Sequence, residues 1–172
     1  MMNGNANNVA QKIIVGVGGL GNRLLSFVLE TELLKGRWVA VDTDAQTLMK
    51  SLSPKRIQIG EKETRGLGTN GDAGMGRRAV EEAREKLLPL FGRGENVYIL
   101  AGLKGGTSLG ALSVLCECAK STGAHTVLYA VIDGETPTEK EKSVLAAWRT
   151  LADGIQIWCK DKQDGFTSAA KL

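Results

Sequence analysis

The sequence predicts an α/β protein, a Rossmann-like three-layer sandwich in which helices cover both faces of a mostly parallel sheet. Short apolar runs alternate with segments of helical periodicity along the chain, a pattern typical of repeated strand–helix–strand units. Glycine-rich segments follow several of these runs, and the ligands of parallel sheets bind at the carboxyl ends of the strands. A chain of 172 residues is long enough to bury a sizeable core as one domain.

The first half of the chain begins with an apolar run, Lys12 to Val17, which predicts a buried strand. Apolar residues recur at helical spacing over residues 23–35, and Gly36 is typical of a helix end. Further strands are expected at 38–41 and 56–59, with a short helix at 45–51 between them. Residues 60–76 are polar and rich in glycine, so we expect a long loop there.

The second half repeats this alternation. Mixed charges at helical spacing predict a helix over residues 77–90, and an apolar run at 96–100 predicts the central strand. The remaining expected elements are a helix at 111–122, a strand at 126–132, a turn at 133–138, a helix at 139–152 and a strand at 155–158. We therefore expect a disordered tail at 1–11, one domain at 12–164 and a loose C-terminal end at 165–172.

Composition and charge argue against several classes of protein. The formal net charge is +3 and the basic residues are dispersed, so we expect no nucleic-acid partner. The apolar runs are too short to cross a bilayer, and the polar start lacks the apolar core of a signal peptide, so we expect no membrane insertion. Cys116, Cys118 and Cys159 fit no zinc-binding spacing, which favours reduced thiols in a cytoplasmic protein. The single histidine, His125, is expected to be structural.

Two glycine-rich segments, Gly18–Asn22 and Ala101–Ala111, each follow an apolar run and precede a helical one. Glycine lets backbone N–H groups approach a phosphate closely, and a helix N-terminus adds a positive dipole. We therefore expect two phosphate-binding loops in one nucleotide-binding domain. The candidate phosphate-binding residues are Gly18, Gly19, Gly21 and Asn22 in the first segment, and Gly102, Lys104, Gly105, Gly106, Thr107, Ser108 and Gly110 in the second.

Several blocks, in this order, resemble the nucleotide-binding half of FtsZ, a relative of tubulin. Val15–Asn22 resembles the first phosphate loop of that family, and Ala40–Leu48 (AVDTDAQTL) is close to its A-V-N-T-D-A-Q-A-L block. Gly105–Gly110 (GGTSLG) resembles the tubulin signature G-G-G-T-G-x-G. Further blocks are Gln58–Lys62, Thr64–Gly68 and Gly123–Val127, so that the resemblance extends from Ile13 to about Lys162. Each block alone is a weak signal, whereas their order and spacing together are specific.

The resemblance implies a site for GTP or GDP. Gly18–Asn22 and Gly105–Gly110 would contact the phosphates, Asp44 would lie near the nucleotide, and Thr69, Asn70 and Gly71 would face the terminal phosphate. A glutamate of the family helps to hold the ribose, and Glu135 and Glu139 match it equally well. Nucleotide phosphates commonly bring Mg²⁺, and the sequence leaves open whether this site needs it. No residue is predicted to be a metal ligand.

The chain departs from the family pattern at several positions. Lys104 replaces the leading glycine of the signature, and a phosphate contact and an orientation toward water are equally plausible for it. Leu109 is bulkier than the usual residue and is expected to crowd the helix start. Arg23 and Ser26 replace asparagines. Asp42 also replaces an asparagine, and its carboxylate would repel phosphate unless it points away or binds a metal.

The sequence stops where the long central helix of the family would begin, before its catalytic loop and second domain. We therefore expect a guanine-nucleotide-binding domain of a cytoskeletal or cell-division system with weak or absent hydrolysis. The catalytic residues are unknown, and Asp44 and Asp72 are the only acidic candidates in the loops. The expected partners are the nucleotide and either a second copy of the chain or a full-length FtsZ-like protein.

Two alternatives remain open. The first is an FtsZ-like scaffold that has lost its ligand and interacts with, or caps, a full-length relative, since a fold does not guarantee a function. The second is a Rossmann-type dinucleotide or adenylate enzyme, because Gly16–Gly21 also fits G-x-G-x-x-G and Asp42 lies roughly at the acidic position. That interpretation leaves the glycines of residues 102–110 unexplained.

Overall fold

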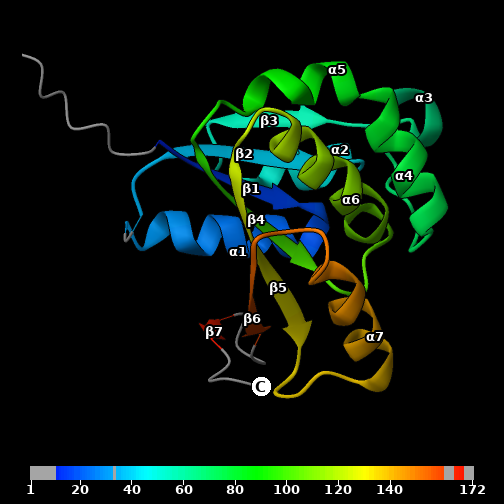
Figure 1. Cartoon of the computed structure of the whole chain (residues 1–172). Helices are drawn as coiled ribbons and strands as arrows, with labels where there is room; N and C mark the ends of the chain where they lie inside the picture. Colours follow the sequence, from blue (N-terminus) through cyan, green and yellow to red (C-terminus); the bar gives the residue numbers. More distant parts are fainter. Residues whose placement is uncertain (1–10, 33, 161–164, 169–172) are drawn as a thin grey trace, which may run out of the picture.

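The computed structural model describes residues 11–32, 34–160 and 165–168. Their centre is a seven-stranded sheet of order β3-β2-β1-β4-β5-β6-β7 (Figure 1). The strands are β1 (Lys12–Val17), β2 (Arg37–Asp42), β3 (Lys55–Gln58), β4 (Asn96–Gly102), β5 (His125–Asp133), β6 (Gly154–Lys160) and β7 (Phe166–Ser168). Neighbours from β3 to β6 are parallel and β7 is antiparallel to β6, which confirms the predicted fold class.

Helices cover both faces of this sheet (Figure 1). They are α1 (Gly18–Glu30), α2 (Ala45–Lys50), α3 (Glu61–Thr64), α4 (Ala73–Glu82), α5 (Arg84–Leu87), α6 (Gly106–Ser121) and α7 (Glu139–Trp148), with a 3-10 turn at Leu88–Leu90. Successive strand residues point to opposite faces, so β1 contributes to two cores. Ile13 and Val15 pack with α4 to α7, whereas Ile14 packs with α1 and α2.

The glycine segments are shorter loops than the sequence predicts. Helix α1 begins at Gly18, so residues 18–22 form its first turn, and it ends at Glu30 instead of Lys35. Strand β4 continues through Gly102 and α6 begins at Gly106, which leaves only residues 103–105 between them. Each expected phosphate loop is therefore largely a helix N-terminus.

The prediction of one long loop at 60–76 was wrong, because these residues include α3 and the start of α4. Asp72 caps α4 by accepting a hydrogen bond from the Met75 amide at 3.0 Å. The helix expected at 77–90 is divided among α4, α5 and the 3-10 turn, which contains Pro89. Pro89 has no backbone N–H, so it cannot continue the hydrogen-bond pattern of an α-helix.

At the C-terminal end, residues 166–168 form β7, where a loose end was predicted. Phe166 is buried, and its ring centroid lies 5.4 Å from that of Phe27 in α1. Residues 1–10 of the predicted tail and residues 169–172 of the predicted end lie outside the described residues. Among the helices that the structure describes, none combines the length and the apolar character that a membrane span needs.

Helices α4 and α6 pack backbone against backbone. A Cβ added at Gly76 would lie 2.2 Å from the Gly106 carbonyl oxygen, and one added at Gly110 would lie 2.2 Å from the Ala73 carbonyl oxygen. Such approaches are possible only where no side chain intervenes. The glycines of this helix pair therefore fix the distance at which α4 covers the start of α6.

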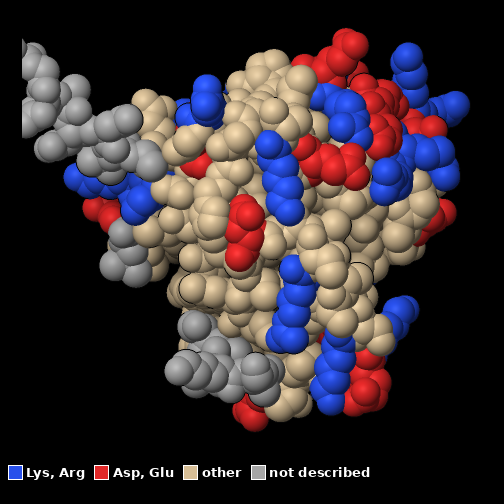
Figure 2. Space-filling view, viewed as in Figure 1, with Lys and Arg blue, Asp and Glu red and all other residues tan. Residues whose placement is uncertain are grey.

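Charged residues of both signs are mixed over the face that α3, α4 and α5 share (Figure 2). Arg84 pairs with Glu81 at 2.8 Å and with Glu117 of α6 at 3.0 Å, and Arg78 pairs with Glu63 of α3 at 2.9 Å. These exposed pairs each contribute little to stability. They explain why the basic residues of this face form no continuous positive stripe.

Candidate functional site

The N-termini of α1 and α6 meet at the carboxyl ends of β1 and β4. The Ser108 hydroxyl donates a hydrogen bond to the Val17 carbonyl at 3.1 Å and so joins the start of α6 to the end of β1. Gly18 lies against it with a φ of 70°, and a Cβ there would lie 2.7 Å from the Ser108 hydroxyl oxygen. The first N–H groups of both helices lack intrahelical acceptors and emerge at this junction.

A cavity of 250 Å³ opens at this junction. It is lined by Gly19, Leu20, Arg23, Gly102, Lys104, Gly105, Ser108, Asp133 and Lys160. A Cβ added at Gly19 would meet nothing within 4 Å, and one at Gly105 would meet only the Ser108 hydroxyl at 3.3 Å. The wall is thus open backbone flanked by three cationic side chains and one carboxylate, and these features suit a phosphate group.

Six of the eight predicted glycines fall into two groups. Gly19, Gly102 and Gly105 line the cavity. Gly21, Gly106 and Gly110 instead pack against protein backbone, since an added Cβ would lie 2.2 Å from the Leu100 oxygen, 2.6 Å from the Asp72 nitrogen and 2.2 Å from the Ala73 oxygen, respectively. For the second group, the need for glycine follows from helix and strand packing and not from the space a phosphate would occupy.

Three buried threonines join the segments beside the start of α6. The hydroxyls of Thr43 and Thr107 lie 2.7 Å apart, and those of Thr69 and Thr107 lie 3.5 Å apart. Thr69 and Thr107 are each 5% exposed, so both contact the protein interior. Asn70 and Gly71, with φ values of 48° and 84°, lie at the surface next to them. Residues 69–71 therefore lie beside the N-terminus of α6, where the resemblance implies a contact with the terminal phosphate, but the Thr69 hydroxyl faces Thr107.

The two acidic loop candidates are helix caps. Asp44 accepts hydrogen bonds from the amides of Gln46 at 2.8 Å and Thr47 at 3.1 Å, and so caps α2. Asp72 caps α4 through Met75. In the described parts of the chain, no group of three or more His, Cys, Asp or Glu side chains is placed to hold a metal ion.

Asp42 is turned into the protein. It is 2% exposed, and its carboxylate accepts from the amides of Thr43 at 2.7 Å and Asp44 at 3.2 Å. Burial raises the pKa of Asp42, although these hydrogen bonds and one from Asn22 oppose the increase. Of the two sequence hypotheses for this carboxylate, the structure supports the one in which it points away.

Asn22 joins α1 to the end of β2 instead of facing the 250 Å³ cavity. Its amide nitrogen donates to the Val41 carbonyl at 3.1 Å and to Asp42 at 3.4 Å, and the residue is 3% exposed. Leu109 does not crowd the helix start as predicted, because its side chain packs against the main core. Both side chains therefore have structural contacts that the motif alone did not reveal.

Lys104 lines the 250 Å³ cavity, and its side chain is 59% exposed and pairs with a glutamate that the sequence does not single out. Its ammonium lies 3.6 Å from Oε1 of Glu141, whose side chain is 3% exposed. Glu141 closes a capping box with Thr138 at the start of α7. The T-x-x-E spacing of residues 138–141 is the sequence signal of such a box, whereas the family resemblance points to Glu135 and Glu139 for the ribose. Glu139 pairs with Lys142 at 2.7 Å, and neither Glu135 nor Glu139 is among the residues that line the 250 Å³ cavity.

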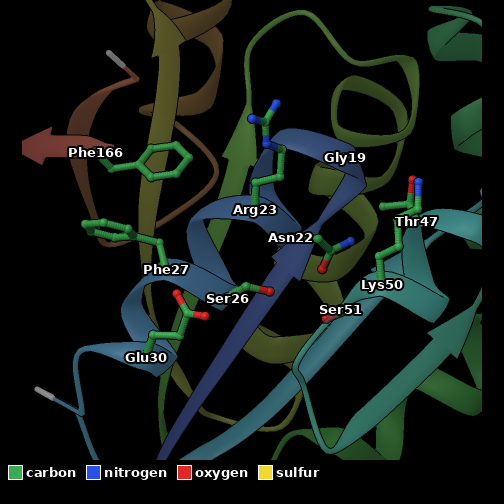
Figure 3. A pocket seen from close by; sticks show the side chains of 10 residues that line it. All are labelled: Gly19, Asn22, Arg23, Ser26, Phe27, Glu30, Thr47, Lys50, Ser51 and Phe166. Carbon is green, nitrogen blue, oxygen red and sulfur yellow. The ribbon is translucent and has the colours of Figure 1, made fainter. Parts of the chain in front are cut away.

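A second cavity of 380 Å³ lies over the outer surface of α1 and shares Gly19 and Arg23 with the first. Figure 3 shows Arg23 and Gly19 at one end, Phe27 and Phe166 along one side, and residues of α2 opposite them. The other lining residues are Asn22, Ser26, Glu30, Thr47, Lys50 and Ser51. Arg23 and Ser26, the two replacements in the first helix, therefore both face this cavity. Phe166 was missed because its contribution depends on β7.

The family model of the tubulin/FtsZ GTPase domain matches residues 11–156. Among solved structures, an FtsZ dimer from M. jannaschii is 30% identical with a TM-score of 0.79, and the match covers 92% of this chain and 47% of that one. A point mutant of FtsZ from M. jannaschii is also 30% identical, with a TM-score of 0.78 and coverages of 90% and 48%.

The fold is also similar to that of CetZ from Methanosaeta thermophila strain DSM 6194, at 20% identity and a TM-score of 0.68, with coverages of 88% and 46%. The chain thus spans about half the length of the solved structures that it matches. The family match covers most of the chain, and strands β1 to β5, the two helix N-termini and the signature segment lie within it. The chain therefore belongs to the tubulin/FtsZ family, and residues 11–156 correspond to its GTPase domain.

Proposed function

We propose that the chain binds GTP or GDP, with the phosphates in the 250 Å³ cavity between the N-termini of α1 and α6. The observation that supports this most directly is the open backbone at Gly19 and Gly105. Both lie at helix N-termini, where N–H groups and the helix dipole favour an anion. Lys104, Arg23 and Lys160 add positive charge around the same space.

The nucleoside would then extend into the 380 Å³ cavity, because the two cavities share Gly19 and Arg23. This cavity combines aromatic side chains with hydroxyl, carboxylate and ammonium groups, as ligand sites for a polar ring usually do. Glu30 would accept hydrogen bonds from the guanine N–H donors, which adenine does not offer in the same pattern. A change of Glu30 to Gln should therefore weaken GDP binding without weakening pyrophosphate binding.

Membership of the family supports a role in a cytoskeletal or cell-division system of the cytoplasm. The further partner would be a second copy of the chain or a full-length FtsZ-like protein. We expect hydrolysis to be weak or absent, because Asp44 and Asp72 are used as helix caps and neither is free to activate water. Mg²⁺ would be held mainly by the phosphates, since the carboxylates of Asp42, Asp44 and Asp72 accept hydrogen bonds from the protein.

The test is calorimetric titration of nucleotide-stripped protein with GTP, GDP, ATP and NAD, with and without Mg²⁺. Gly19→Ala places a methyl group where an added Cβ meets nothing within 4 Å outside its own helix, so it should weaken binding about tenfold or more and leave folding intact. Gly74→Ala, on an exposed position of α4, is the matched control and should bind like the wild type. Equal affinity of the wild type and Gly19→Ala would refute the cavity assignment.

A scaffold that has lost its ligand is the second candidate, and Ser108 favours it. Its hydroxyl occupies the junction between the two helix N-termini and already bonds to Val17. If the wild type binds none of the four nucleotides but Ser108→Gly binds GDP, this side chain blocks the site and the scaffold is the better hypothesis. No such observation favours the dinucleotide enzyme. That hypothesis gives Gly102 and Gly105 no role, yet both line the same cavity as Gly19.

A further inference from the structure

Lys104 lies between the 250 Å³ cavity and the start of α7. It lines the 250 Å³ cavity together with Gly19, Gly105 and Ser108, while its ammonium lies 3.6 Å from Glu141 at the start of α7. The lysine is 59% exposed and the glutamate 3% exposed. One end of this ion pair is therefore free to move, and the other is fixed in the protein.

Glu141 is fixed by the capping box of α7. Its Oε2 accepts from the Thr138 amide at 2.8 Å and from the Thr138 hydroxyl at 2.7 Å. Its Oε1 is buried and accepts no hydrogen bond in the described residues, so the ammonium of Lys104 is the charge that faces it. Burial raises the pKa of Glu141, but the bonds from Thr138 and the charge of Lys104 outweigh burial, and the net pKa is lowered.

A phosphate in the cavity would compete for the same ammonium. A lysine stem is flexible and its charge is compact, so Lys104 can turn toward an anion beside Gly105 without moving the backbone. When it does so, Oε1 of Glu141 stays buried without its positive partner, which is unfavourable. Binding of a phosphate is then weaker than the cavity alone would allow.

We propose that Glu141 sets the nucleotide affinity of the site by competing with the bound phosphate for the side chain of Lys104. This inference rests on the proposed function, because it needs a phosphate in the 250 Å³ cavity. Glu141 itself touches no part of that cavity, so it acts through Lys104. The same exchange links an occupied site to the first turn of α7.

The test compares four proteins, the wild type, Glu141→Gln, Lys104→Gln and the double variant, by titration with GDP and with pyrophosphate. Glutamine keeps the capping box, which accepts either Glu or Gln at this position. Glu141→Gln should bind both ligands about twofold to fivefold more tightly, the range expected when one partner of an ion pair is mostly exposed. Lys104→Gln should bind more weakly, and the double variant should bind like Lys104→Gln.

An unchanged or lower affinity of folded Glu141→Gln would overturn the inference, as would an equal gain in the presence and absence of Lys104. If the wild type binds neither GDP nor pyrophosphate, the proposed function itself fails. If Glu141→Gln does not fold, hydrogen exchange of the wild type decides. Pyrophosphate should speed amide exchange in residues 138–142, and unchanged or slower exchange there would contradict the proposed competition.

Discussion

Replacing Gly110 by alanine should destabilise the protein, because the approach of α4 to α6 depends on this position. An added Cβ would lie 2.2 Å from the Ala73 oxygen, 2.3 Å from the Arg77 nitrogen and 2.5 Å from the Gly76 carbon. Real Cβ atoms essentially never come within 3.0 Å of another heavy atom. All three neighbours are helix backbone, so they cannot rotate away, and α4 must move off α6.

The expected loss follows from two opposing contributions. Overpacking of a core costs about 3 kcal/mol at the upper end of its usual range, which applies where only backbone can move. Alanine is favoured over glycine in a helix by about 1 kcal/mol, which offsets part of this. The net loss is about 2 kcal/mol, or a decrease of about 4–8 °C in the melting temperature of a domain of this size.

Thermal unfolding followed by circular dichroism measures this change. Gly74→Ala is the control, since it is the same substitution in α4 at an exposed position. Its added Cβ would lie 3.1 Å from Oδ1 of Asp72, the cap of α4, and 3.6 Å from a terminal nitrogen of Arg78, and it would meet no backbone of a neighbouring element within 4 Å. The control should therefore melt at the wild-type temperature or slightly above it. If Gly110→Ala melts together with the control, the backbone contact of α4 and α6 is not what fixes this helix pair.

Three further predictions concern single side chains. Asp42→Asn should raise the free energy of unfolding at neutral pH, because the raised pKa of Asp42 means that folding disfavours its charged form. Urea titrations should show that this gain shrinks as the pH falls through the raised pKa toward the ordinary aspartate range. Asp44→Ala removes the cap of α2 and should lower the unfolding free energy by about 1 kcal/mol in urea, whereas an unchanged midpoint would contradict the cap. Burial raises the pKa of Cys116 to about 12, so a thiol reagent at about pH 8 should label the partly exposed Cys159 first and Cys116 only after unfolding.

The sheet could be predicted from the sequence because its signals are local. The apolar runs at 12–17 and 96–100 alternate with helical segments, and the structure places them as β1 and β4 at the centre. The start of α4 could not be predicted in this way. Its glycines, Gly74 and Gly76, indicate a loop because glycine has a low helix propensity. Both nevertheless lie in α4, and at position 76 a glycine is required because α6 leaves no space for a side chain.

The candidate site was predicted in position but not in the role of each residue. The two glycine segments do meet at one cavity, because parallel strands end at the same edge of the sheet. Glu141 could not be assigned to it, since its contact with Lys104 joins positions 37 residues apart in the sequence. The sequence also did not show that Asp42, at the end of β2, turns into the interior. That orientation depends on hydrogen bonds from the Thr43 amide and from Asn22 of α1.

The glycines of the two segments are therefore under two separate constraints, and this affects what they indicate about function. Gly106 and Gly110 are needed wherever α4 and the residues just before it pack on α6, whether or not a nucleotide binds. Gly19 and Gly105 are not required by any neighbouring backbone, since an added Cβ would meet open space or only the Ser108 hydroxyl. A relative that had lost its ligand would retain the first pair for stability, and the second pair would be free to change. Glycine at positions 19 and 105 is thus the part of the pattern that favours nucleotide binding over an empty scaffold.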